Sequence, residues 1–125
     1  MNTKIGYLYR DADNYKIWNE AVVAGSMTAE QKQIIAGCLK DGEYFIPSAV
    51  ALPEVTFVNF GFSYNEQSDG PFFELSIDDI YETQADPTVA HLTVTGLVEK
   101  FQQAKGKWDE LASATENCRM EVSSV

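Results

Sequence analysis

Two segments rich in apolar residues, the first of them alternating, lie close together at the start of the chain, and they constrain its fold more than any other feature. They cover residues 4–9 and 15–23, and their apolar members are Ile5, Tyr7, Leu8, Tyr9, Ile17, Trp18, Ala21 and Val22. Such alternation is typical of β-strands, and the polar residues 10–14 between them favour a turn. We therefore expect an antiparallel hairpin, although Ile17, Ala21 and Val22 also fit the spacing of a helix.

A helix start signal follows at Thr28 and Gln31, which form a capping box: the threonine oxygen accepts from the backbone three residues on, and Gln31 reaches back. One face of this helix carries Ile34, Ile35, Cys38 and Leu39. Lys40 suits the negative C-terminal end, and Asp41-Gly42 is suited to stop the helix. The pattern predicts one helix between residues 28 and 40.

The middle of the chain favours further extended structure. We expect Tyr44, Phe45 and Ile46 to lead into an apolar extended stretch bounded by Pro47 and Pro53. A long strand is expected at residues 55–64. Residues 65–70 end in Asp69-Gly70, which is typical of a turn. Residues 72–81 alternate again, so the sequence predicts a return strand there.

A second helix is predicted at residues 95–112, where apolar residues recur at spacings of three and four. They are Val98, Phe101, Ala104, Trp108 and Leu111. Gly106 lies inside this segment and is able to kink or divide it. Residues 113–125 contain few apolar side chains, and we expect this tail to fray.

These elements predict a single α+β domain over residues 1–125, with a mostly antiparallel sheet and two helices packed on one face. The chain has two cysteines, Cys38 and Cys118, without metal-site spacing, so we expect reduced thiols, with Cys38 in the core. Neither a secretory signal nor a run of about 18 apolar residues occurs. We expect a cytoplasmic protein that does not bind membranes.

The charge distribution departs from the average. The formal net charge is −10, yet no lysine or arginine lies between Lys40 and Lys100. The segment 41–99 holds 11 of the 19 acidic residues, which leaves 8 acidic and 9 basic residues for the rest of the chain. A field of this sign repels nucleic acid and attracts basic partners.

Three interpretations of this acidic segment stay open. The charge serves solubility alone, or it forms an interaction face for a basic protein, in a narrower form by imitating nucleic acid, or it binds multivalent cations. The candidate residues for an acidic face are Glu66, Asp69, Glu74, Asp78, Asp79, Glu82 and Asp86. Residues 65–70 resemble the start of a calcium loop, but Ser76 stands where a bidentate glutamate is needed.

A dense polar cluster occupies the predicted hairpin tip. The candidate ligand-binding residues are Arg10, Asp11, Asp13, Asn14, Tyr15 and Lys16, together with Tyr44 from later in the chain. Guanidinium, carboxylate and phenol groups at one turn can converge on a ligand, or they can satisfy one another through an Asx turn and an ion pair. Both alternatives remain.

Residues 7–16, with Tyr9-Arg10-Asp11 and Asn14-Tyr15-Lys16, and residues 41–47, Asp41 to Pro47, resemble a group of small bacterial proteins with no assigned activity. The likeness covers about the first 55 residues. It implies a bacterial cytosolic source and transfers no functional residue.

Catalytic motifs are missing from the sequence. The one histidine, His91, has no neighbouring cysteine or second histidine, and no G-x-S-x-G, P-loop or G-x-G-x-x-G pattern occurs. We expect no cofactor and no metal. The leading hypothesis is a non-enzymatic acidic interaction protein that binds a basic protein surface, and the alternative is a small-ligand binder or enzyme that uses the residue 10–16 cluster.

Overall fold

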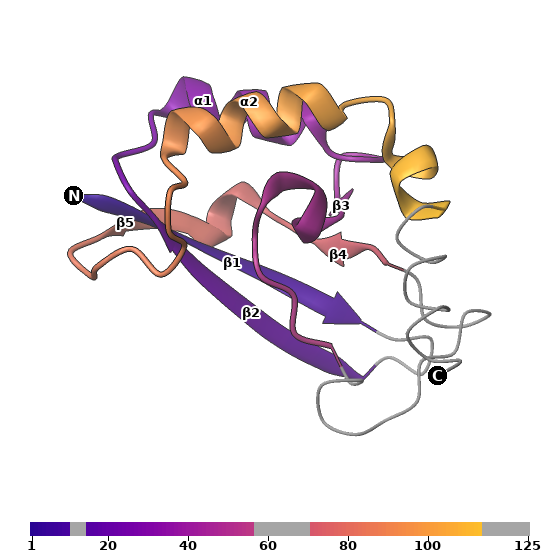
Figure 1. The fold of residues 1–125 in the computed structure, drawn as a ribbon, viewed down its shortest axis with the longest axis horizontal. Helices are drawn as coiled ribbons and strands as arrows, with labels where there is room; N and C mark the ends of the chain where they lie inside the picture. The colour runs from indigo at the N-terminus through magenta and orange to yellow at the C-terminus, as the bar shows by residue number, and fades with distance from the viewer. Residues whose placement is uncertain (11–14, 57–70, 114–125) are drawn as a thin grey trace.

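The structure is a computed structural model that describes residues 1–10, 15–56 and 71–113. Its elements, in chain order, are β1 (Asn2–Arg10), β2 (Lys16–Val23), α1 (Ala29–Cys38), β3 (Tyr44–Phe45), the 3-10 helix η1 (Pro47–Val50), β4 (Phe73–Glu74), the 3-10 helix η3 (Ile77–Asp79), β5 (Ile80–Thr83) and α2 (Val94–Ala104). The strands form one antiparallel sheet, and both helices lie over the same face of it (Figure 1). The predicted α+β class is confirmed.

β1 is the central strand of the sheet. On one side it pairs with β2 along the whole hairpin, from Thr3 opposite Val23 to Arg10 opposite Lys16, so residues 16–23 form a strand and not a helix. On its other side β1 pairs first with β5 and then with β4, and β4 in turn pairs with β3. The turn residues 11–14 lie outside the described residues.

The predicted return strand at residues 72–81 is wrong in its middle. The structure divides it into β4 and β5, with η3 between them. The side chain of Ser76 accepts a hydrogen bond from the backbone N–H of Asp78 at 3.2 Å, which caps the 3-10 turn. The alternating pattern of residues 72–81 therefore does not reveal the break in the strand, which the Ser76 cap creates.

The extended stretch predicted between Pro47 and Pro53 is also wrong in part. Pro47 begins η1, because its fixed φ and missing N–H suit the first helical position. After η1 the chain runs along β2. There the buried Asn19 side chain donates to the carbonyl of Val55 at 3.0 Å and accepts from its N–H at 2.7 Å. Asn19 thus takes the place of a neighbouring strand; residues 57–64 of the predicted long strand lie outside the described residues.

The helix capping box is confirmed. Thr28 accepts from the backbone of Gln31, and the Gln31 side chain accepts from the backbone N–H of Thr28. α1 ends at Cys38, slightly before the expected stop, and Lys40 reaches Asp109 beyond α2. Cys38 is buried in the core as expected, and Cys118 lies outside the described residues.

The second helix is shorter than predicted. α2 ends at Ala104, Gly106 adopts a left-handed φ of 77°, and a further helical segment occupies residues 108–113. Of the two alternatives for Gly106, division of the helix is the one observed. The tail at residues 114–125 is not among the described residues.

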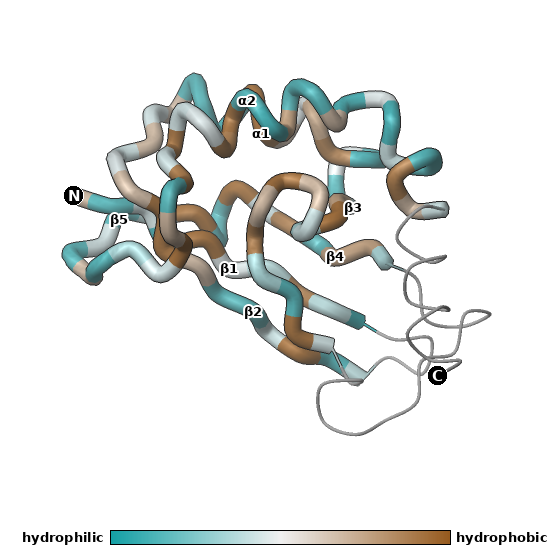
Figure 2. Tube along the Cα trace, in the orientation of Figure 1, coloured by the Kyte–Doolittle hydropathy of each residue, from teal (hydrophilic) through white to brown (hydrophobic). Residues whose placement is uncertain are grey.

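The core lies between the sheet and the helices. Its aromatic centre runs from Tyr7 on β1 through Phe45 to Phe101 on α2, with ring centroids 5.6 Å and 5.5 Å apart. Figure 2 shows helices that carry both hydrophilic and hydrophobic stretches, as expected of elements that cover a core on one side. Within the described residues no helix is long and apolar enough to cross a membrane.

Candidate functional site

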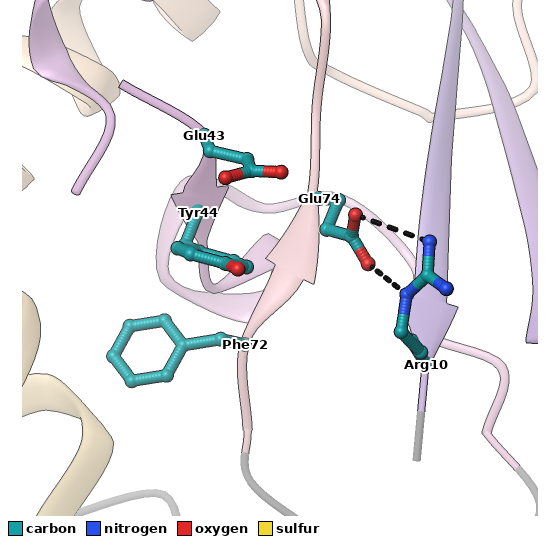
Figure 3. Close-up of a pocket in the computed structure, with 5 residues that line it drawn as sticks. All are labelled: Arg10, Glu43, Tyr44, Phe72 and Glu74. Atoms are coloured by element: carbon teal, nitrogen blue, oxygen red, sulfur yellow. Dashed lines mark hydrogen bonds and ion pairs between the residues drawn. The ribbon is translucent and has the colours of Figure 1, made fainter. Parts of the chain in front are cut away.

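Two of the predicted ligand residues, Arg10 and Tyr44, come together in an open depression of about 450 Å³. It is lined by Arg10, Glu43, Tyr44, Phe72 and Glu74 (Figure 3). The sheet register explains this meeting, because Leu8, Glu74 and Tyr44 lie side by side on three neighbouring strands. Arg10 follows Leu8 by two residues and therefore shares its face.

Arg10 is engaged by Glu74. Its Nε donates to one carboxylate oxygen at 2.8 Å and its Nη2 to the other at 3.5 Å. This hydrogen bond from β1 to β4 raises the pKa of Arg10 above its ordinary value, with the charge of Glu74 adding to the effect. Arg10 thus pairs with a carboxylate from β4, which the sequence had not singled out as its partner.

Tyr15 and Lys16, two further predicted ligand residues, do not join the depression. Tyr15 and Lys16 are exposed at the start of β2, and neither is among the lining residues. Asp11, Asp13 and Asn14 lie outside the described residues. The sequence did not identify Glu43 and Phe72 as site residues. Glu43 could have been found from its position next to Tyr44 in the segment 41–47, whereas no sequence pattern points to Phe72 as a site residue.

Among the described residues, the lining of the depression offers charge and aromatic surface and no serine or cysteine side chain that could act as a nucleophile. Its two carboxylates stand against one guanidinium, and Phe72 already has the Lys40 ammonium 4.8 Å from its ring centroid. Lining of this kind suits recognition of a charged group better than covalent chemistry.

Replacing Arg10 with alanine is expected to lower the melting temperature slightly, because Glu74 then loses its partner across the β1–β4 junction. Arg10→Lys should recover part of the loss, since lysine keeps the charge but not the two-pronged geometry. Thermal unfolding followed by circular dichroism measures both. A melting temperature unchanged in Arg10→Ala would show that the ion pair does not support the sheet.

The predicted acidic residues fall into two places. Asp78 and Asp79 lie in η3, Glu82 on β5 and Asp86 in the loop that follows, and all four are exposed or half-buried. Glu74 lies apart on β4 with Arg10. Glu66 and Asp69 are outside the described residues. The first four lie in one continuous segment that contains η3, β5 and the loop after β5, and we call this acidic segment the η3–β5 edge.

Cys38 and His91 are two further residues whose side chains could take part in chemistry. Burial raises the pKa of the Cys38 thiol, which makes it a poor nucleophile at neutral pH. His91 is exposed, with a left-handed φ of 62°. In the part of the chain that the structure describes, no group of three or more His, Cys, Asp or Glu side chains is placed to hold a metal ion.

Comparisons with protein-family models, with curated proteins and with solved structures found no match.

Proposed function

We propose that this chain is a non-enzymatic interaction protein that binds a basic protein partner through the η3–β5 edge. The observation that supports this proposal is the succession of Asp78, Asp79, Glu82 and Asp86 in one continuous segment that includes η3 and β5. Among the described residues no strand pairs with the outer side of β5, so these carboxylates border an edge that a partner can approach.

The charge of the surrounding segment supports the same partner. No lysine or arginine occurs between residues 41 and 99 to neutralise the η3–β5 edge locally. The nearest cation shown by a contact, the Lys4 ammonium beside Tyr81, is already paired with Glu20. Such a field accelerates encounter with a basic surface and repels nucleic acid.

In a narrower form of the proposal, the partner is itself a nucleic-acid-binding protein, and the carboxylates stand in for phosphates. The resemblance of residues 7–16 and 41–47 to small bacterial proteins, with the buried reduced Cys38, supports a setting in the bacterial cytoplasm. Competition between the chain and duplex DNA for the same partner tests the narrower form.

One observation favours a second candidate function, the binding of a small charged ligand. Arg10 and Tyr44, which the sequence nominated as members of one candidate site, share the depression of Figure 3. Ligand binding there is expected to raise the melting temperature in a concentration-dependent way. A screen of small charged metabolites by thermal shift, repeated on Tyr44→Ala, distinguishes this candidate from protein recognition at the η3–β5 edge.

Selection of peptides from a random library against the full chain tests the main proposal. We expect enrichment of lysine and arginine in the selected peptides. Charge reversal by Asp78→Lys, Asp79→Lys and Glu82→Lys should slow their association about tenfold. Raising salt from about 50 to 300 mM should slow association with the unmodified chain as well, because it shortens the screening length. Stopped-flow fluorescence measures the rates.

A matched control separates the η3–β5 edge from net charge alone. The triple variant Glu30→Lys, Glu99→Lys and Glu110→Lys reverses three exposed carboxylates elsewhere and changes the formal net charge by the same amount. Equal slowing in both triple variants would refute the η3–β5 edge as the interaction site. Selected peptides without basic enrichment would refute a basic partner altogether.

A further inference from the structure

The face of the sheet that lies opposite the helices carries a second hollow, of about 200 Å³. It is lined by Gly6, Trp18, Asn19, Glu20, Asp79 and Tyr81. On β1 the side chains of Ile5 and Tyr7 point into the core, so Gly6 faces the other way, opposite Glu20 of β2. No element among the described residues packs on this face, while α1 and α2 both cover the other (Figure 1).

Two large aromatic side chains border the hollow and are open to solvent. Trp18 is 60% exposed and Tyr81 is 49% exposed, whereas Tyr7, Phe45, Phe73 and Phe101 are almost completely buried. Aromatic side chains gain most from being covered. Two of them exposed around one hollow therefore indicate a surface that a partner covers.

Gly6 forms the floor of the hollow, and the fold does not require a glycine there. Its φ is not in the left-handed region, and an added Cβ would meet Asp79 Cβ at 3.7 Å and the Asn19 carbonyl oxygen at 3.9 Å, which are ordinary contact distances. A glycine inside a strand weakens it and often marks the close approach of a ligand. Any larger side chain at this position would fill the hollow.

The rim of the hollow favours a cation. Glu20 and Asp79 contribute two carboxylates. Among the described residues the cation beside them is Lys4, whose Nζ lies 3.2 Å from Glu20 and 5.9 Å from the centre of the Tyr81 ring. Lys4 shows that a cation is held between this carboxylate and this ring. The second carboxylate keeps the rim negative, and the exposed Asp78 and Glu82 lie beside it in sequence.

We propose that this hollow receives an arginine side chain of a protein partner, an inference that rests on the basic partner proposed above. The guanidinium would stack against Trp18 and Tyr81 and donate to Glu20 and Asp79. Arginine fits better than lysine because its planar guanidinium stacks on aromatic rings and also donates two parallel hydrogen bonds to a carboxylate. The hollow would thus anchor a partner that the η3–β5 edge attracts.

A direct test uses a glycine–serine peptide with one central arginine, titrated into the isotope-labelled full chain. The Trp18 indole N–H signal should shift with the arginine peptide, less with a lysine peptide, and not with the neutral citrulline peptide. Trp108 supplies an internal reference, because its indole is buried and donates to the Cys38 carbonyl. An unmoved Trp18 signal, or equal shifts with citrulline, would overturn the proposal.

Variants of the floor and rim sharpen the test. Gly6→Val should weaken the arginine peptide at least about tenfold without lowering the melting temperature, since valine favours strands. Gly6→Ala serves the same purpose if valine prevents folding. Lys4→Gln should strengthen binding severalfold, because it releases Glu20 and Tyr81. Gly37→Ala, on α1 with open space around its Cβ, is the control and should leave binding unchanged.

The two proposals fail separately. Gly6→Val leaves every charge in place, so unchanged binding of the arginine peptide to a folded Gly6→Val chain would refute the hollow while the charge-reversal test of the η3–β5 edge stands. Selected peptides without basic residues would instead refute the proposed function, even where the arginine peptide moves the Trp18 signal.

Discussion

Replacing Trp108 with alanine is expected to lower the free energy of unfolding by about 3–5 kcal/mol. The side chain is 4% exposed, its ring lies edge-on to Phe101 at 6.3 Å between centroids, and its indole N–H donates to the Cys38 carbonyl at 2.7 Å. Trp108 therefore ties the segment at 108–113 to both α1 and α2. Urea unfolding followed by circular dichroism measures the loss.

Trp108→Phe separates packing from hydrogen bonding. Phenylalanine keeps much of the buried area and loses the indole donor, so we expect a smaller loss, of about 1–3 kcal/mol, from the unsatisfied Cys38 carbonyl. An unfolding midpoint for Trp108→Ala equal to that of the unmodified chain would remove residues 108–113 from the core.

The same tryptophan shows what periodicity can and cannot predict. The stripe from Val98 to Trp108 correctly identified a buried face, because spacings of three and four reflect the helical repeat. It did not show that Gly106 leaves the helix, since only the backbone conformation, φ 77°, distinguishes a divided helix from a kinked one. The apolar stripe continues past Gly106 because the chain forms a further helical segment that also buries its apolar side chains in the core.

The strands show a parallel limit. The hairpin was predictable because two apolar segments lie on either side of a short polar turn, and the first of them alternates. The break at η3 was not, because Ser76 fits the polar phase of a strand as well as it fits a cap. Asn19 is a further case. Its buried side-chain amide forms two hydrogen bonds with the backbone of Val55, a role that the sequence alone does not show.

The candidate sites were predictable in part. Arg10 and Tyr44 were nominated from composition, and the register that brings them together depends on β4, whose position the sequence did not give. The hollow over Gly6 had a usable signal, since the phase that buries Ala21 and Asn19 leaves Trp18 on the outside. To use this signal one must know which residues of the hairpin face the core. Apolar residues on both faces of the hairpin make that assignment ambiguous from sequence.

Replacing Phe45 with alanine is expected to cost about 3–5 kcal/mol as well, because it opens a cavity at the centre of the aromatic core. Phe45 is completely buried and connects the sheet to a helix: its ring meets Tyr7 of β1 edge-on and stacks with Phe101 of α2 at 29° between planes. It lies on β3, a strand of two residues that also pairs with β4 and bridges to Lys40.

A double-mutant cycle with Phe101→Ala tests whether Phe45 acts through the stacked pair. Aromatic pairs contribute about 0.5–1.5 kcal/mol beyond their buried area, so the two losses should add to more than the loss in the double variant by an amount of this size. Phe45→Leu is the volume-preserving control and should cost less than Phe45→Ala. Strictly additive losses, measured by urea unfolding, would show that the two rings support the core independently and that β3 is held by its pairing with β4.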